Sequence, residues 1–141
     1  MTDTDHARQN AASWSETIAE MIRALEAAHS KDSEIGAWRE VDAAHTAIHE
    51  AALSVEVRSD WYTPCDANPE PVEYQILLST GGPAVRITGR LNAYDEPETA
   101  DLEYQDWGTP WTRYHPAHGE PLFDSHNADI LTFAQQFFFG E

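Results

Sequence analysis

The spacing of hydrophobic residues changes at Leu53, and this change constrains the fold more than any other feature of the chain. Before Leu53, apolar residues recur every three or four positions, which is typical of amphipathic helices. After it, apolar and polar residues alternate, which is typical of strands with one buried face. The sequence therefore predicts an α+β fold, with a helical hairpin in residues 1–52 and a sheet plus a last helix in residues 53–141.

Two helices are predicted in the first segment. The first has an apolar stripe made of Trp14, Ile18, Met21, Ile22 and Leu25. Ser13 and Glu16 fit a capping box at its start, although a start near Asp5 is also allowed. The second helix is expected over residues 33–52, with an apolar stripe made of Trp38, Val41, Ala44, His45, Ile48 and Ala52. A few polar residues join the two helices, so we expect them to pack antiparallel.

The second segment predicts an antiparallel meander of four strands, at residues 53–58, 72–80, 84–91 and 99–107. On the solvated face, the arginines of the third strand are expected opposite carboxylates of its two neighbours. A final helix is predicted from Asn127, which is a favourable N-cap residue. The three phenylalanines that follow it are expected to dock on the sheet or on a partner.

Net charge is the unusual quantity of this sequence. Twenty-five acidic residues face eight basic ones, which gives a formal charge of −17. This sign argues against direct binding of DNA, RNA or anionic membranes, because each would be repelled. It favours a basic protein as the partner. The alternative is an acidic surface that serves solubility alone, as in a salt-loving host.

Size and composition predict a single domain spanning residues 1–141. Hydrophobic residues make up 41% of the chain, which excludes disorder as its main state. No run is apolar enough for a membrane helix, and the acidic N-terminus does not fit a secretory signal. Cys65 is the single cysteine, so an internal disulfide is excluded. We therefore expect a cytoplasmic protein.

The sequence contains only weak catalytic and metal-binding motifs. His45 and His49 have a spacing that suits a metal, but no HExxH pattern surrounds them, and His45 coincides with the apolar stripe. Cys65 lies among carboxylates that would raise rather than lower the pKa of its thiol. The sequence therefore predicts no catalytic residue, no metal and no cofactor, and we expect a protein that is not an enzyme.

Aromatic rings set among carboxylates are the candidate partner-binding residues. Tryptophan and tyrosine dominate interface hot spots, and acidic neighbours would form a polar rim facing a basic partner. The predicted contact residues are Asp60, Trp61, Tyr62, Asp66, Glu70, Asp95, Glu96, Glu98, Asp106, Trp107, Trp111 and Tyr114. The alternative for the rings near Trp107 is structural: they would seal the core beneath a long loop.

The segments LLSTGGPAVRITGRL, LEYQDWGTPWT and FAQQFFFGE resemble a family of small acidic proteins with no assigned activity, from bacterial plasmids, integrative elements and phages. The resemblance covers roughly residues 53–141. The resemblance consists of similar stretches of sequence and includes no catalytic signature, so it assigns no functional residues. What it implies is a mobile-element setting, where small acidic proteins often act against host defence as anti-CRISPR or antirestriction factors.

Charge and resemblance together favour a non-enzymatic inhibitor that binds a basic, nucleic-acid-handling protein. A CRISPR effector or a restriction nuclease is the expected target, and carboxylates on a rigid scaffold would mimic DNA phosphates. The alternative is a structural or regulatory interaction module, for example a homodimer joined through its aromatic C-terminus. An enzyme that uses carboxylate chemistry comes third.

Overall fold

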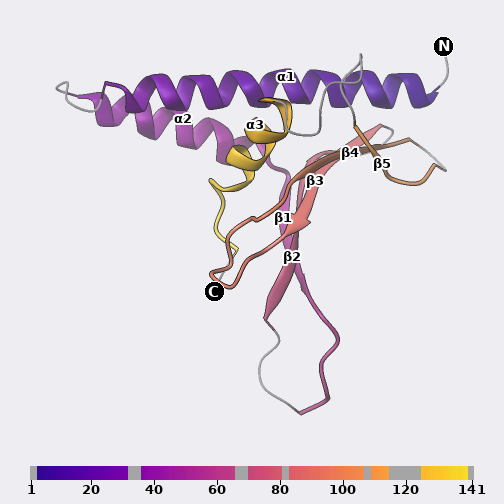
Figure 1. The fold of residues 1–141 in the computed structure, drawn as a ribbon. Helices are drawn as coiled ribbons and strands as arrows, with labels where there is room; N and C mark the ends of the chain where they lie inside the picture. The colour runs from indigo at the N-terminus through magenta and orange to yellow at the C-terminus, as the bar shows by residue number, and fades with distance from the viewer. Residues whose placement is uncertain are drawn as a thin grey trace.

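The computed structural model describes residues 3–31, 36–65, 70–80, 83–106, 109–114 and 125–139. Three helices, α1 (Asp3–His29), α2 (Ala37–Ala51) and α3 (Ser125–Ala134), accompany five strands, β1 (Ser54–Ser59), β2 (Pro71–Ser79), β3 (Ala84–Arg90), β4 (Asp101–Gln105) and β5 (Thr112–Arg113). The helices lie on one side of the sheet, and the sheet extends away from α1 (Figure 1). The predicted α+β class is therefore confirmed, with the change from helix to strand close to Leu53.

The helix α1 is continuous and longer than its apolar stripe indicates. Ser13 lies inside it, so the predicted capping box is wrong and the earlier start is the correct one. The reason is that residues 7–12 contain good helix formers, and that Ala7 and Ala11 are fully buried in the core. Within the described ranges, no helix is both long and apolar enough to cross a membrane.

The helix α2 begins at Ala37, directly after Gly36, whose φ of 84° places it in the left-handed region. The predicted start at Ser33 falls outside the described residues. Trp38 belongs to the predicted apolar stripe, yet its side chain is mostly exposed, with the Arg39 guanidinium 5.4 Å from the ring centroid. The first turn of α2 lies far from the sheet, so nothing in the described core covers this ring (Figure 1).

The strands form one antiparallel sheet in the order β1-β2-β3-β4-β5. The sequence predicts four strands, and the fifth, β5, corrects that number. Two residues are too few to show an alternating pattern, and Thr112 and Arg113 pair only with Tyr104 and Glu103 of β4. The strand β4 is also shorter than predicted, because its pairing with β3 extends only from Asp101 to Gln105.

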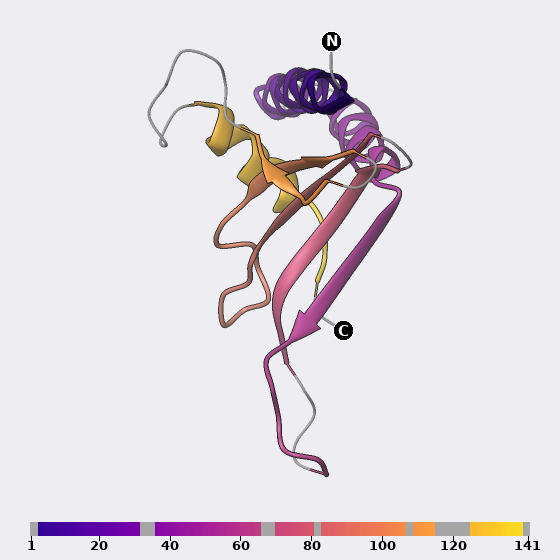
Figure 2. The same ribbon diagram turned by 90° about the vertical axis from the view of Figure 1, so that its right-hand side faces the viewer.

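The core lies between the sheet and the helices α1 and α3, which both contact β4 (Figure 2). Its fully buried side chains come from every layer and include Ile18, Ile22, Ile48, Ile76, Ile87, Leu102, Ile130 and Phe133. Along β2 and β4 the buried residues alternate with partly exposed ones. This confirms the sequence-based alternation and leaves the other sheet face open.

Gly89 is required where the β3–β4 connection crosses β3. A Cβ atom at this position would lie 2.0 Å from the carbonyl oxygen of Thr99 and 2.7 Å from the ring of Tyr74. The same carbonyl oxygen accepts a hydrogen bond of 2.6 Å from the Tyr74 hydroxyl. The missing side chain therefore allows Thr99 to approach the sheet closely enough for this bond.

The C-terminal segment docks on the helix-covered face of the sheet through one of its three phenylalanines. Phe139 is buried, with its ring centroid 4.8 Å from that of Tyr74, and Phe137 packs against Phe133. Phe138 is mostly exposed. Asn127 lies inside α3, which starts at Ser125, so the predicted N-cap is wrong. Helix boundaries are harder to place from sequence than the helices themselves, and several polar residues precede the apolar stripe here.

Candidate partner-binding site

Two loops that carry predicted contact residues lie at the same end of the sheet. In an antiparallel meander, successive connections alternate between the two ends, so the β1–β2 and β3–β4 connections share the end away from α1 (Figures 1 and 2). We call residues 60–65, residue 70 and residues 92–98 the distal end. Its predicted contact residues are Asp60, Trp61, Tyr62, Glu70, Asp95, Glu96 and Glu98.

The backbone of residues 92–98 is held by the side chain of Asn92. Its Oδ1 atom accepts hydrogen bonds from the backbone N–H groups of Tyr94, at 2.8 Å, and Glu96, at 3.1 Å. The N–H of Asn92 donates to the carbonyl oxygen of Glu96 at 2.8 Å, which closes the turn. Asp95 has a φ of 60°, a left-handed conformation that aspartate tolerates better than most residues. The turn therefore presents its side chains from a fixed backbone.

Tyr94 is the functional candidate that sequence reasoning missed. Its side chain is 82% exposed, and the carboxylates of Asp95, Glu96 and Glu98 belong to the same turn. A signal was available in the sequence, because an aromatic residue within NAYDEPE belongs to no apolar stripe and has no expected place in the core. Exposed tyrosine is a frequent anchor of protein interfaces, since its ring offers a large area at a small cost in conformational entropy.

The β1–β2 connection adds two further exposed rings to the distal end. Trp61 is fully exposed and Tyr62 is mostly exposed. Cys65 is exposed as well, and its φ of 67° is also left-handed. Asp66, the remaining predicted contact residue of this connection, lies outside the described residues. The distal end thus combines three exposed rings with acidic residues from two separate connections.

The described contact residues after β4, which are Asp106, Trp111 and Tyr114, lie at the opposite end of the sheet and contact other parts of the fold there. Asp106 is buried, and its backbone N–H donates to Thr109 Oγ1 at 2.9 Å. The Trp111 ring lies 4.0 Å beneath the guanidinium carbon of Arg86, and Tyr114 packs against the core. Trp107 lies outside the described residues. This placement agrees with the structural alternative for these rings and separates them from the distal end.

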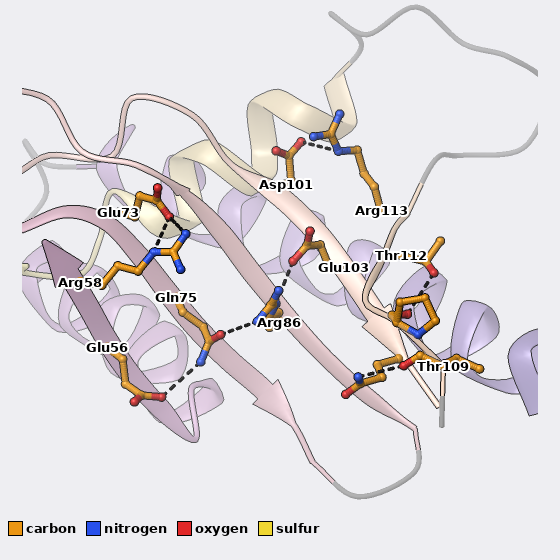
Figure 3. A network of polar contacts seen from close by, with 12 residues as sticks. Glu56, Arg58, Glu73, Gln75, Arg86, Asp101, Glu103, Thr109, Thr112 and Arg113 are labelled. Atoms are coloured by element: carbon orange, nitrogen blue, oxygen red, sulfur yellow. Dashed lines mark hydrogen bonds and ion pairs between the residues drawn. The ribbon is translucent and has the colours of Figure 1, made fainter. Parts of the chain in front are cut away.

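Three ion pairs join arginines and carboxylates on the open face of the sheet (Figure 3). Arg58 Nε donates to Glu73 at 2.8 Å, Arg86 Nε donates to Glu103 at 2.8 Å, and Arg113 Nε lies 3.3 Å from Asp101. This confirms that an arginine of the third strand faces a carboxylate of its neighbour. The pairing leaves the face close to neutral, so the acidic surplus lies elsewhere.

A shallow depression of about 420 Å³ lies over this open face, lined by the paired residues of β1 to β4. Arg86 Nη1 donates to Gln75 Oε1 at 2.7 Å, and Gln75 Nε2 donates to Glu56 Oε1 at 3.2 Å. A row of hydrogen bonds therefore runs from Glu103 to the edge strand β1. Because Arg86 and Glu103 already neutralise each other, the centre of the depression offers little to recognise a charged ligand.

Histidines do gather between α1 and α2, but without the geometry of a metal centre. The ring centroid of His45 lies 6.2 Å from the ring centroid of His29 and 6.2 Å from that of His49. The Nε2 atom of His49 lies 2.7 Å from the carbonyl oxygen of Gln136. Across the described side chains, no three His, Cys, Asp or Glu residues converge on a position suitable for a metal ion.

Burial, and secondarily the charge of Asp101, raises the pKa of Tyr74 far above its ordinary value, which keeps this phenol protonated in its hydrogen bond to Thr99.

The chain matches no protein-family model, no curated protein sequence and no solved structure.

Proposed function

We propose that this protein is a non-enzymatic binding protein whose distal end docks on a basic, nucleic-acid-handling protein. The observation that carries the proposal is Tyr94, an 82% exposed ring among carboxylates on a turn whose backbone Asn92 fixes. Exposing a large ring on a small domain loses the free energy that its burial would gain. A ring held in this way serves contact with another molecule better than it serves the fold.

The proposed contact uses charge for encounter and the rings for affinity. A formal charge of −17 steers the chain toward a cationic surface, at a rate that falls as salt rises. Once docked, Tyr94 and Trp61 are suited to stack on arginine side chains, which dominate nucleic-acid-binding surfaces. The fixed turn reduces the conformational entropy that is lost on binding.

The proposed target class is supported by the charge and by the resemblance of three sequence segments to small acidic proteins of mobile elements. In that setting, we propose that the protein inhibits a CRISPR effector or a restriction nuclease by occupying its DNA-binding surface. Carboxylates at the distal end would take the place of DNA phosphates there. The near-neutral open face of the sheet lies outside the proposed contact.

A charge-matched pair of variants tests the proposal. One variant reverses the acids of the turn, as Asp95→Lys, Glu96→Lys and Glu98→Lys; the control reverses three exposed acids of α1, as Glu16→Lys, Glu20→Lys and Glu26→Lys. Both have the same net charge. Each is used as bait in a bacterial lysate, and captured proteins are identified and then challenged with duplex DNA. We expect the parent and the control to capture a DNA-binding protein that DNA displaces, and the turn variant to lose it.

Single ring variants separate specific docking from general charge attraction. Tyr94→Ala and Trp61→Ala leave the net charge unchanged, and each should weaken capture by roughly tenfold or more if the ring is a hot spot. The proposal fails if both charge variants lose capture equally, if the ring variants bind like the parent, or if DNA does not compete.

A further inference from the structure

The outer edge of β1 has backbone groups that are ready for another strand. The N–H of Leu91 donates to the carbonyl oxygen of Val72, which sets the alternation of the ladder between β2 and β3. It follows that Ser54, Glu56 and Arg58 direct their backbone groups toward β2, whereas Val55 and Val57 direct theirs outward. Within the described ranges, no strand pairs with this outer edge.

The apolar layer of the helix-covered face ends one strand before the edge. Tyr74 of β2 is 3% exposed, whereas Val57, its neighbour across β1, is 47% exposed. Leu53 and Val55, on the same face as Val57, are exposed as well. An edge strand with a row of exposed apolar side chains, without proline or lysine, invites pairing with another strand.

We propose that β1 pairs antiparallel with β1 of a second copy of this chain, about a two-fold axis at Val57. In such a pair the residues opposite each other lie on the same sheet face, so the axis passes through a residue rather than between two. An axis at Val57 places Glu56 opposite the partner's Arg58, and this ion pair occurs twice. An axis at Glu56 would oppose two carboxylates, and one at Val55 would oppose Glu56 to a serine.

This register continues two features of the single chain. On the open face, the row of hydrogen bonds from Glu103 through Arg86 and Gln75 ends at Glu56 on the edge strand, where the partner's Arg58 extends it (Figure 3). On the helix-covered face, Val57 meets the partner's Val57, which covers the centre of the exposed apolar row of β1.

Net charge sets how this dimer responds to salt. Two chains with a formal charge of −17 each repel one another, and added salt screens this repulsion at long range. We therefore expect dimerisation to strengthen as salt rises. Capture of a basic partner should weaken over the same range, so the two associations are distinguished by the sign of their salt dependence.

Sedimentation velocity of the full chain tests the register, from about 5 µM to about 300 µM protein in about 150 mM NaCl. The parent should shift from monomer to dimer as concentration rises. Glu56→Arg opposes two cations and Arg58→Glu opposes two anions, so each variant should dimerise roughly tenfold or more weakly. The double variant E56R/R58E restores opposite charges and should dimerise like the parent. A mixture of the two single variants should form the heterodimer.

Circular dichroism checks that each variant is folded, and Val57→Lys provides a second disruption that leaves both ion-pairing residues in place. The proposal is overturned if the parent remains monomeric at about 300 µM. It is also overturned if the parent dimerises but the single charge variants and Val57→Lys do so equally well, because another surface would then hold the copies together.

Discussion

At the scale of single residues, Tyr74 joins the core to the β3–β4 connection. Its ring is buried against Phe139, and its hydroxyl donates to the carbonyl oxygen of Thr99 at 2.6 Å. This environment raises the pKa of the phenol above its ordinary value of 10.0. The folded chain therefore keeps the proton at a pH where the unfolded chain has released it.

This difference predicts a loss of stability in alkali. Below pH 10 both states are protonated and the full contribution is present, whereas above pH 10 only the unfolded state ionises. The free energy of unfolding should then fall by up to about 1.4 kcal/mol per pH unit from this group. Urea unfolding at several pH values between about pH 9 and about pH 11 measures this slope.

Two variants assign the alkaline slope to this residue. Tyr74→Phe removes the titrating group and should flatten the slope, while it lowers stability at neutral pH by about 1 kcal/mol through the lost hydrogen bond. Tyr94→Phe, which changes an exposed phenol, should keep the parental slope. An identical slope in Tyr74→Phe and the parent would contradict the assignment.

Individual residues were predictable where a periodic pattern places them. The buried positions of Ile18, Ile76 and Leu102 follow from their spacing, because a helix and a strand each have a fixed repeat. The contact between Arg86 and Trp111 was not predictable, since it depends on a five-residue strand followed by a return of the chain. Tyr94 was missed because a turn has no repeat that would separate a displayed ring from a buried one.

At the scale of elements, the turn 92–98 predicts the effect of removing its side-chain acceptor. Asn92→Ala leaves the N–H groups of Tyr94 and Glu96 without Oδ1, so stability should fall by about 0.5–1.5 kcal/mol. Asn92→Asp keeps an acceptor oxygen and should retain most of the stability once salt screens its added charge. Urea unfolding compares the three proteins; equal stability of Asn92→Ala and the parent would show that the turn does not depend on this side chain.

Elements were predicted well where they are long and poorly where they are short or where they end. The strands β2 and β3 lie within one residue of their expected bounds, because hairpin register and alternation agree there. The start of α1 was misjudged because a capping signal at Ser13 competes with an uninterrupted run of helix formers before it. A two-residue strand such as β5 is specified by its partner strand rather than by its own sequence.

At the scale of the whole molecule, charge opposes folding. The open sheet face is nearly balanced, so the surplus negative charge lies on the helices and the connections, where carboxylates repel one another through solvent. The free energy of unfolding should therefore rise between about 10 mM and about 500 mM NaCl. Urea unfolding at low protein concentration measures it, and KCl should act equally if screening is the cause. Stability that falls or stays constant with salt would contradict this account.

The separation of the distal end from the core has a consequence for how such a protein can change. None of the rings and carboxylates that form the distal end belongs to the buried cluster that holds the helices on the sheet. The exposed side chains of both connections can therefore vary while the scaffold persists, since exposed loop positions tolerate substitution. For the proposed inhibitor role, this separation of binding residues from the core would allow the target specificity to change without a new fold.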